Sequence, residues 1–315
     1  MVNDRAGAEN RSDSGPLRDP VVGWYRGGMS LRAQALEEFE LPAAPQRVDD
    51  LPPPAPGTSV CSVHTPAGRF LLFCSAGALS LAFEATLFDL LAESRYPAPA
   101  PRRARRGSFI GVLGGQRAAS CYPWPPGEEL TPALATIPQL MEVGRLLARL
   151  HQLGEAHPAS VQDPCDPVAL LASCPEGDER DTLSGVVETP LPPLPTGAGH
   201  GGLTPRRALF MGDRCSAVLP SGIAASGALV LDLAEAALGW MMGSTRPSAA
   251  LRALTSGYQA LRRLFAEERD ALFAALRLAA GREGARRLST GQSGALDGLK
   301  AVNSVGESEV RAAAG

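Results

Sequence analysis

The sequence predicts a two-lobed α+β protein, with a small β-rich amino-terminal lobe that contains one helix and a larger helical carboxy-terminal lobe. Three observations lead to this prediction. Residues 59–75 and 109–124 contain the alternating β-branched and aromatic residues of strands. From about residue 125, apolar residues recur at helical spacing instead. A chain of 315 residues is long enough to bury two cores.

The small lobe is assigned to residues 29–124. Residues 1–28, which precede it, are polar and aperiodic, so we expect a disordered arm there. LRAQALEEFEL (31–41) predicts a short helix. LPPPAPG (51–57) then reads as a connector, because proline has no amide donor for a helix or a central strand.

The remaining small-lobe elements are a hairpin, a helix and further strands. SVCSVHT and RFLLFCS flank PAG, which predicts a turn at residues 66–68. SLAFEATLFDLLAE (80–93) places its leucines and phenylalanines along one broad helical face. In the strand region 109–124, Gly114-Gly115 predicts a turn.

Residues 125–288 are assigned to the helical lobe, and residues 289–315 are predicted to be a flexible polar tail. Residues 160–199 are rich in proline, glycine and aspartate, so we expect loop or poorly packed structure there. Helices are predicted over residues 137–151, 227–243, 247–263 and about 266–288.

Composition excludes several classes of protein. The formal charge is −3, with 44% hydrophobic and 20% charged residues, so the basic excess of a nucleic-acid binder is missing. The first twenty residues lack the apolar run of a secretory signal, and the window 228–242 is too short to cross a bilayer. We therefore expect a cytoplasmic protein without a membrane span.

The cysteines and histidines do not form a recognisable metal or disulfide pattern. No CxxC pair occurs, and no histidine stands at ligand spacing from a cysteine. The sequence predicts neither a zinc site nor a disulfide framework. The residues considered are Cys61, Cys74, Cys121, Cys165, Cys174, Cys215, His64, His151, His157 and His200.

HGGLTPRRALF (200–210) has the frame of a phosphotransferase catalytic loop. Other segments accompany it in a fixed order: GVLGGQRAASCYPWPPGEEL, VGRLLARLH, ALVLDLAEAALGW and LTSGYQALRRLFAEERDAL. Over about residues 31–288 the chain resembles the bacterial homoserine kinases and aminoglycoside phosphotransferases. The resemblance implies a protein-kinase-like fold and an ATP-dependent phosphotransferase activity.

Within that resemblance, the three positions that carry the chemistry are altered. The family loop resembles H-G/A-D-L-x-x-x-N-x-L-F, and a later strand ends in I-D, with Asp acting on the attacking hydroxyl and Asn and the second Asp holding magnesium. Gly202, Arg207 and Pro220 occupy these positions here. Gly202 removes a general base worth about 10²- to 10⁴-fold in rate. Arg207 and Pro220 offer no metal ligand, so magnesium binding is not expected.

Small-lobe groups that would contact nucleotide phosphates are also missing. The only lysine, Lys300, lies in the predicted tail, and the strand position that carries a lysine in aminoglycoside phosphotransferases is assigned to Leu72. GTSVCSVHT (57–65), taken as the phosphate loop, lacks the asparagine-bearing pattern of the family.

Other candidate residues have competing interpretations. His200 and Asp232 resemble the family residues that support the catalytic loop, and we assign them to its framework rather than to chemistry. Glu84 is either the partner of a phosphate-contacting cation or, as favoured with Leu72 opposite, a surface or hinge carboxylate. RRARR (102–106) either attracts an anionic partner or, as favoured, forms a solvated loop.

The cleft offers a candidate nucleotide or anion site. Arg206 and Arg207 could hold a phosphate or carboxylate without a metal, since guanidinium forms bidentate contacts, although solvent exposure is the favoured interpretation. Cys121, Tyr122 and Trp124 fall at the hinge where the backbone of a kinase meets adenine.

Three hypotheses follow. The leading one is a catalytically inactive pseudokinase that acts by binding a small molecule, a nucleotide or a protein partner. The second is a residual ATP-dependent kinase for homoserine or a similar amino alcohol, with Asp213 or Asp232 taking over metal binding. The third is a decayed gene product without a selected activity.

Overall fold

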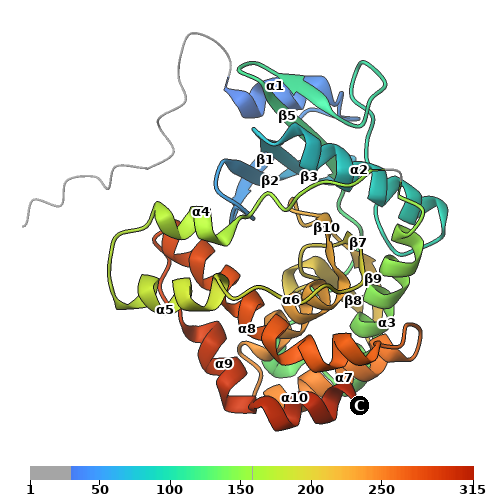
Figure 1. Cartoon of the computed structure of the whole chain (residues 1–315). Coiled ribbons are helices and arrows are strands. Elements are labelled where there is room, and N and C mark those ends of the chain that lie inside the picture. Colours follow the sequence, from blue (N-terminus) through green and yellow to red (C-terminus); the bar gives the residue numbers. More distant parts are fainter. Residues whose placement is uncertain (1–29, 158) are drawn as a thin grey trace, which may run out of the picture.

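The computed structural model describes residues 30–157 and 159–315, which form a small β-rich lobe and a larger helical lobe (Figure 1). The predicted fold class is confirmed. The predicted arm, residues 1–28, lies outside the described residues. The small lobe contains an antiparallel five-stranded sheet of order β1-β2-β3-β5-β4. Its strands are β1 (Arg47–Leu51), β2 (Thr58–Thr65), β3 (Gly68–Ser75), β4 (Gly111–Leu113) and β5 (Arg117–Pro123).

Two helices cover the two faces of this sheet. Alternate residues of a strand point to opposite faces. Phe70, Leu72 and Cys74 accordingly pack with Ala35 and Phe39, in and beside α1 (Leu31–Glu38). On the other face, Leu71 and Phe73 of β3 and Tyr122 of β5 pack in one core with Leu87 and Phe88 of α2 (Ala78–Glu93) and with the helical lobe.

The predicted turns of the small lobe are confirmed. Thr65 pairs with Gly68 at the end of the β2–β3 ladder, so the chain reverses at residues 66–67. Leu113 pairs with Arg117 across the β4–β5 turn. Gly115 there has φ +72°, a conformation that glycine adopts without steric cost.

The helical lobe is built around α3 (Ile137–Gly154), α6 (Leu229–Met241), α7 (Pro247–Gln259) and α8 (Ala266–Ser289). α3 and α7 approach closely at two glycines: a Cβ on Gly144 would lie 2.0 Å from the Leu254 carbonyl, and one on Gly257 would lie 2.0 Å from the Met141 carbonyl. Larger residues at either position would force these helices apart.

Two segments predicted to be irregular are instead folded. Residues 160–199 contain α4 (Pro167–Ala172) and α5 (Asp178–Val187), which pack on α8 and bury Leu171 and Leu183. The predicted flexible tail forms α9 (Asp297–Val305) and α10 (Glu307–Ala314), which pack against α7 and α8. These four helices are short, and tertiary burial of a few apolar residues stabilises them rather than intrinsic propensity.

Short strands between α5 and α6 carry the candidate catalytic loop. β7 (Thr196–Gly199) pairs with β10 (Ala225–Ala228), and β8 (Ala208–Met211) lies between β9 (Arg214–Val218) and β6 (Glu128–Glu129). HGGLTPRR therefore connects β7 to β8, passing through the short 3-10 helix η3 (Pro205–Arg207). A second such turn, η2 (Pro132–Leu134), precedes α3. No helix in the described ranges is long and apolar enough to cross a membrane.

Candidate functional site

Asp232, in the first turn of α6, organises the loop 200–202. Its Oδ1 accepts hydrogen bonds from the backbone N–H groups of Gly201 and Gly202, at 2.9 Å each. Its Oδ2 accepts from the His200 N–H at 2.7 Å. With all of these acceptor positions used by the backbone, Asp232 is not free to serve as a relocated metal ligand.

A buried chain of polar groups supports Asp232 from the helical lobe. His151 Nε2 lies 2.9 Å from Asp232 Oδ2, and His151 Nδ1 lies 2.7 Å from the Tyr258 hydroxyl. Arg262 donates to the same hydroxyl and pairs with Glu268. Burial raises the pKa of Asp232, but the His151 hydrogen bond and charge, among other donors, lower it to about 2. Asp232 is therefore an ion throughout the physiological range.

His200 is fully buried and contacts the segment that follows β9. Its Nε2 lies 2.9 Å from the Leu219 carbonyl, while its Nδ1 has no partner in the described residues. Burial lowers the pKa of His200, which favours the neutral ring. This geometry suits a framework residue, since the ring joins two backbone segments of the loop.

Gly202, which the resemblance assigns to the position of the family's catalytic aspartate, adopts φ +92°. A Cβ built on Gly202 would meet the Glu235 Cβ at 3.5 Å and the Thr204 Cγ2 at 3.6 Å, both ordinary contacts. Space for a side chain exists, but the backbone conformation is one that residues other than glycine rarely adopt. The local backbone therefore favours glycine at this position.

Arg207 does not point into solvent, so the favoured sequence interpretation is wrong for this residue. Arg207 is partly buried, its Nη2 donates to the Ser221 carbonyl at 3.3 Å, and its guanidinium lies 6.0 Å from the centre of the Phe73 ring. Burial lowers the pKa of Arg207 to about 10, opposed by the charge of Glu84, and the group stays cationic at neutral pH. Arg206 is exposed, so the two arginines differ in environment.

Glu84 is a buried contact between the lobes, which corrects its interpretation as a surface or hinge carboxylate. Its Oε1 accepts from the Ser221 N–H at 2.8 Å, the Ser221 hydroxyl at 2.9 Å and the Gly222 N–H at 2.8 Å. Desolvation raises the pKa of Glu84, although these hydrogen bonds and Arg207 oppose it. Glu84 thus binds the segment that follows Pro220, and Pro220 is buried as well.

The residue of β3 that faces this contact is Phe73 rather than Leu72. Leu72 packs on the opposite face of the sheet, beneath α1. Leu72 was assigned from the family resemblance, and a shift of one residue along a strand exchanges the two faces. Phe73 touches the loop after Pro220, because a Cβ on Gly222 would meet its ring at 2.6 Å. The β3 residue that faces this loop is therefore aromatic and not cationic.

The proline-rich segment 52–57 is the turn that enters the cleft. GTSVCSVHT, predicted to be the phosphate loop, is mostly strand β2, and residues 52–57 connect β1 to it. Pro54 is buried, its carbonyl accepts from Arg286 Nη1 of α8 at 3.2 Å, and its Cγ would lie 2.9 Å from a Cβ on Gly222. Prolines have no N–H to offer a phosphate, so this turn contacts the helical lobe instead.

The hinge residues offer little to a ligand. The Cys121 and Tyr122 side chains are 1% and 0% exposed. Backbone groups there are also engaged: the Cys121 carbonyl accepts from Arg102 N–H, and Trp124 N–H donates to the Arg69 carbonyl, at 2.8 Å each. Arg69 covers the Trp124 ring, 3.4 Å from its centre. Hydrogen bonding to an adenine would require these contacts to break.

Magnesium does not fit the donor set that the cleft presents. Gly202 and Pro220 supply no carboxylate, and Arg207 places a cation beside the Ser221 carbonyl. Asp213, considered as a replacement, lies in the turn at the far end of the β8–β9 hairpin from Arg207, close to Thr136. In the described part of the chain, no group of three or more histidine, cysteine, aspartate or glutamate residues is arranged to hold a metal.

Sequence reasoning missed Glu235, which lies beside Gly202. Glu235 Oε1 is 3.1 Å from Arg282 Nε, and Arg282 also pairs with Asp163 from the segment before α4. Burial and the nearby Asp232 raise the pKa of Glu235 to about 8, while Arg286 lowers it. Glu235 follows Asp232 by three residues in an otherwise apolar helix. That spacing places both carboxylates on one helical face. It was the feature of the sequence from which Glu235 could have been predicted to lie near the loop 200–202.

Comparison with known proteins identifies the family. The homoserine kinase of Rhizobium meliloti is 31% identical over 229 residues, covering 67% of this chain and 69% of that protein. This chain belongs to the homoserine kinase family. The homoserine kinase of Acidiphilium cryptum is 30% identical over 204 residues. That alignment covers 59% of this chain and 62% of the relative. The chain thus spans somewhat less than two thirds of some relatives it matches. No family model matches it.

Solved structures of small-molecule kinases share the fold at low identity. Amicoumacin kinase hAmiN, solved with AMP-PNP, Ca2+ and Ami, superposes with a TM-score of 0.65 at 12% identity, covering 89% of this chain and 91% of that one. A microcompartment-associated aminopropanol kinase superposes with a TM-score of 0.57 at 17% identity, covering 89% and 93%. The predicted family and its aminoglycoside phosphotransferase-like fold are confirmed.

Proposed function

We propose that this homoserine kinase family member is a pseudokinase, which acts by binding and does not transfer phosphate. The observation that carries this proposal is that Arg207 and the 52–57 turn both contact the segment 221–222. Arg207 lies against the Ser221 carbonyl, and Pro54 lies against Gly222. Both contacts involve the segment that immediately follows Pro220, where the family carries its metal-binding aspartate.

Electrostatics supports the same conclusion. A magnesium ion near Ser221 would face the Arg207 guanidinium, and two like charges about 4 Å apart repel appreciably even at an effective dielectric constant near 20. Glu84 Oε1 is already bound by three donors from residues 221 and 222, so only the buried Oε2, which has no partner among the described residues, is left to face a cation. Relocating these groups would require the segment 219–223 to refold.

A set of charged side chains lies on the other side of Gly202, next to Glu235. Asp163, Glu235 and Arg282 form a paired set there, and Arg286 lies nearby on α8. We propose that this set binds a small molecule, and that the protein works in the cytoplasm, alone or with a protein partner. Named relatives and neighbours act on small hydroxyl-bearing molecules, which supports a ligand of that class.

Thermal-shift titration with ATP and ADP, with and without magnesium, tests the proposal. A ligand that binds the native state raises its apparent stability. We expect no magnesium-dependent shift and no turnover of homoserine in a coupled ADP-release assay. A magnesium-dependent shift together with homoserine phosphorylation would overturn the pseudokinase proposal.

A second candidate is an ATP-dependent kinase in which Glu235 replaces the lost base. The observation that favours it is the proximity of Glu235 to Gly202, at 3.5 Å from the position of the missing Cβ. A raised carboxyl pKa suits a general base near neutral pH. On this candidate, Glu235→Gln abolishes homoserine-dependent ADP release, while Glu267→Gln on the exposed first turn of α8 leaves it unchanged. Equal rates in both variants would eliminate Glu235 as the base.

A further inference from the structure

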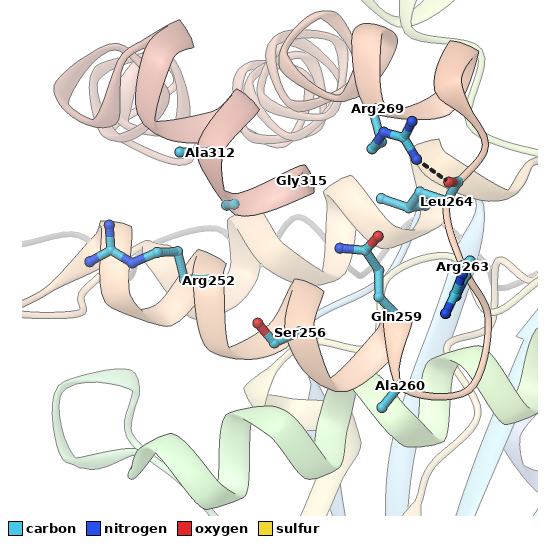
Figure 2. Close-up of a pocket in the computed structure, with 10 residues that line it drawn as sticks. Arg252, Ser256, Gln259, Ala260, Arg263, Leu264, Arg269, Ala312 and Gly315 are labelled. Carbon is cyan, nitrogen blue, oxygen red and sulfur yellow. Dashed lines mark hydrogen bonds between the residues drawn. The ribbon is translucent and has the colours of Figure 1, made fainter.

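A second polar cavity lies in the helical lobe between α7, the start of α8 and α10. Its volume is about 560 Å³. Figure 2 shows Ser256 and Gln259 projecting from α7 toward α10, with Arg269 on the facing wall. Arg263 comes from the connection between α7 and α8. No residue of the cleft described above contributes to this cavity.

The cavity carries an excess of positive charge. Three arginines line it, namely Arg252, Arg263 and Arg269, and none of the described residues that line it has an acidic side chain, while Gly315 adds the terminal carboxylate to the lining. Arg252 is paired with Glu309, 2.5 Å away. Arg269 donates to the Leu264 carbonyl at 2.9 Å, which fixes its direction without neutralising its charge. Among the described residues, neither Arg263 nor Arg269 has an acidic side chain as partner, so the three guanidinium charges outnumber the negative charges of the Glu309 side chain and the terminal carboxylate.

Three polar side chains in the cavity have no protein partner. Among the described residues, the Arg263 guanidinium, the Ser256 hydroxyl and the Gln259 amide make no hydrogen bond or ion pair. Together with Arg269 they present donors from two helices and the segment between them. Guanidinium is always charged and matches oxyanions with its planar set of donors.

From this arrangement we infer that the cavity is a binding site for a phosphate-bearing small molecule. A phosphate group offers three oxygens and nearly two negative charges, so one group can engage both arginines and a neutral donor. A single carboxylate has only two oxygens for the same set. The lining residues Gln259 and Arg263 are the sequence neighbours of Tyr258 and Arg262, which form the outer end of the polar chain that supports Asp232.

Isothermal titration of the full-length chain with inorganic pyrophosphate, at low ionic strength, tests this site. We expect saturable binding at one site per chain that weakens with added salt, as charge pairing at an exposed site requires. Arg263→Gln and Arg269→Gln should each reduce affinity about tenfold or more, the usual effect of losing one charge-assisted hydrogen bond. Ser256→Asp should abolish binding, because it adds a carboxylate to the cavity.

Two matched controls separate this site from other basic surfaces. Arg277→Gln removes an exposed arginine on the same helix, α8, and Arg206→Gln removes an exposed arginine at the cleft. Both variants should bind pyrophosphate like the wild type. Absence of binding, equal weakening in Arg277→Gln, or loss only in Arg206→Gln would overturn the proposal. All variants alter exposed residues, and thermal unfolding verifies that each is folded. Because the cleft is not involved, this result is independent of the pseudokinase proposal.

Discussion

At the scale of single residues, Asp232 couples loop geometry to pH. Its pKa lies at about 2, below the ordinary 3.8, so the ionised form is stabilised by folding. This stabilisation, about 2 kcal/mol, is present above pH 4 and is lost as the pH falls through about 2. In Asp232→Asn, the free energy of unfolding should no longer fall as the pH decreases through about 2. The variant should also be about 3 kcal/mol less stable than the wild type at pH 7, because the backbone donors lose a charged acceptor.

Urea unfolding between pH 7 and pH 2 measures this effect. Asp213→Asn is the control, since Asp213 is an exposed carboxylate in the β8–β9 turn. An Asp232→Asn variant that keeps the wild-type stability at pH 7 would contradict the supporting role of Asp232.

Glu84 should show the opposite pH dependence. Desolvation raises its pKa above the ordinary 4.5, so its contribution to stability is complete below that pH and decreases as the pH rises through the folded-state value. Glu84→Gln keeps an oxygen for Ser221 and Gly222 but cannot ionise. We expect the variant to lose less stability than the wild type between pH 4.5 and pH 8, measured by chemical denaturation. A greater loss in the variant would mean that the charge of Arg207 and the hydrogen bonds to Glu84 outweigh desolvation.

At the scale of elements, the sequence predicted the helices and strands that can be recognised from their own residues. The β2–β3 hairpin has a clear turn signal, and helices α2, α3, α6 and α8 are 13 to 24 residues long. α4, α5, α9 and α10 are only six to ten residues long and depend on α7 or α8 for burial. Helices this short are stabilised by the partners on which they pack, and these partners were not considered when residues 160–199 and 289–315 were interpreted from composition.

The carboxy-terminal helices give a direct test at this scale. Val302 of α9 is 0% exposed, whereas the adjacent Asn303 is exposed. Val302→Asp should lower the free energy of unfolding by about 3 kcal/mol or more, because it buries an unpaired carboxylate. Asn303→Asp adds the same charge at the surface and should change stability by less than about 0.5 kcal/mol. Indistinguishable melting temperatures for the two variants would support the flexible tail that the sequence predicted.

At the scale of the whole molecule, the cleft is assembled from three regions that the sequence keeps apart. Gly202, Arg207 and Pro220 could be located from one motif because they lie within nineteen residues of each other. Phe73 and Pro54 come from the small lobe, and their contacts with Gly222 depend on how the lobes close on each other. Glu84 was misassigned for the same reason, since its partners lie 137 and 138 residues away. The motif therefore predicted which catalytic and metal-binding residues are missing. It did not predict which residues of the small lobe contact the segment after Pro220.

Because residues of both lobes contact the segment after Pro220, we expect that restoring the motif alone will not restore nucleotide binding. In the triple variant Gly202→Asp, Arg207→Asn and Pro220→Asp, the metal ligands return. Position 202 keeps a backbone of φ +92°, which costs a side-chain-bearing residue about 1–2 kcal/mol. The 52–57 turn still presents prolines and remains bound to Arg286. We expect this variant to melt below the wild type and to show no magnesium-dependent shift with ATP.

Opening the turn as well should change the outcome. Replacing Pro52, Pro53 and Pro54 by glycine supplies three N–H groups, and Arg286→Gln releases the carbonyl at position 54 from its charged donor. Added to the triple variant, these changes should produce a thermal shift with Mg–ATP that neither set produces alone, because phosphate and metal contacts are then available together. If the triple variant alone binds Mg–ATP, the proline-rich turn does not block the nucleotide. The changes at positions 202, 207 and 220 are then sufficient to explain the absence of Mg–ATP binding in the wild type.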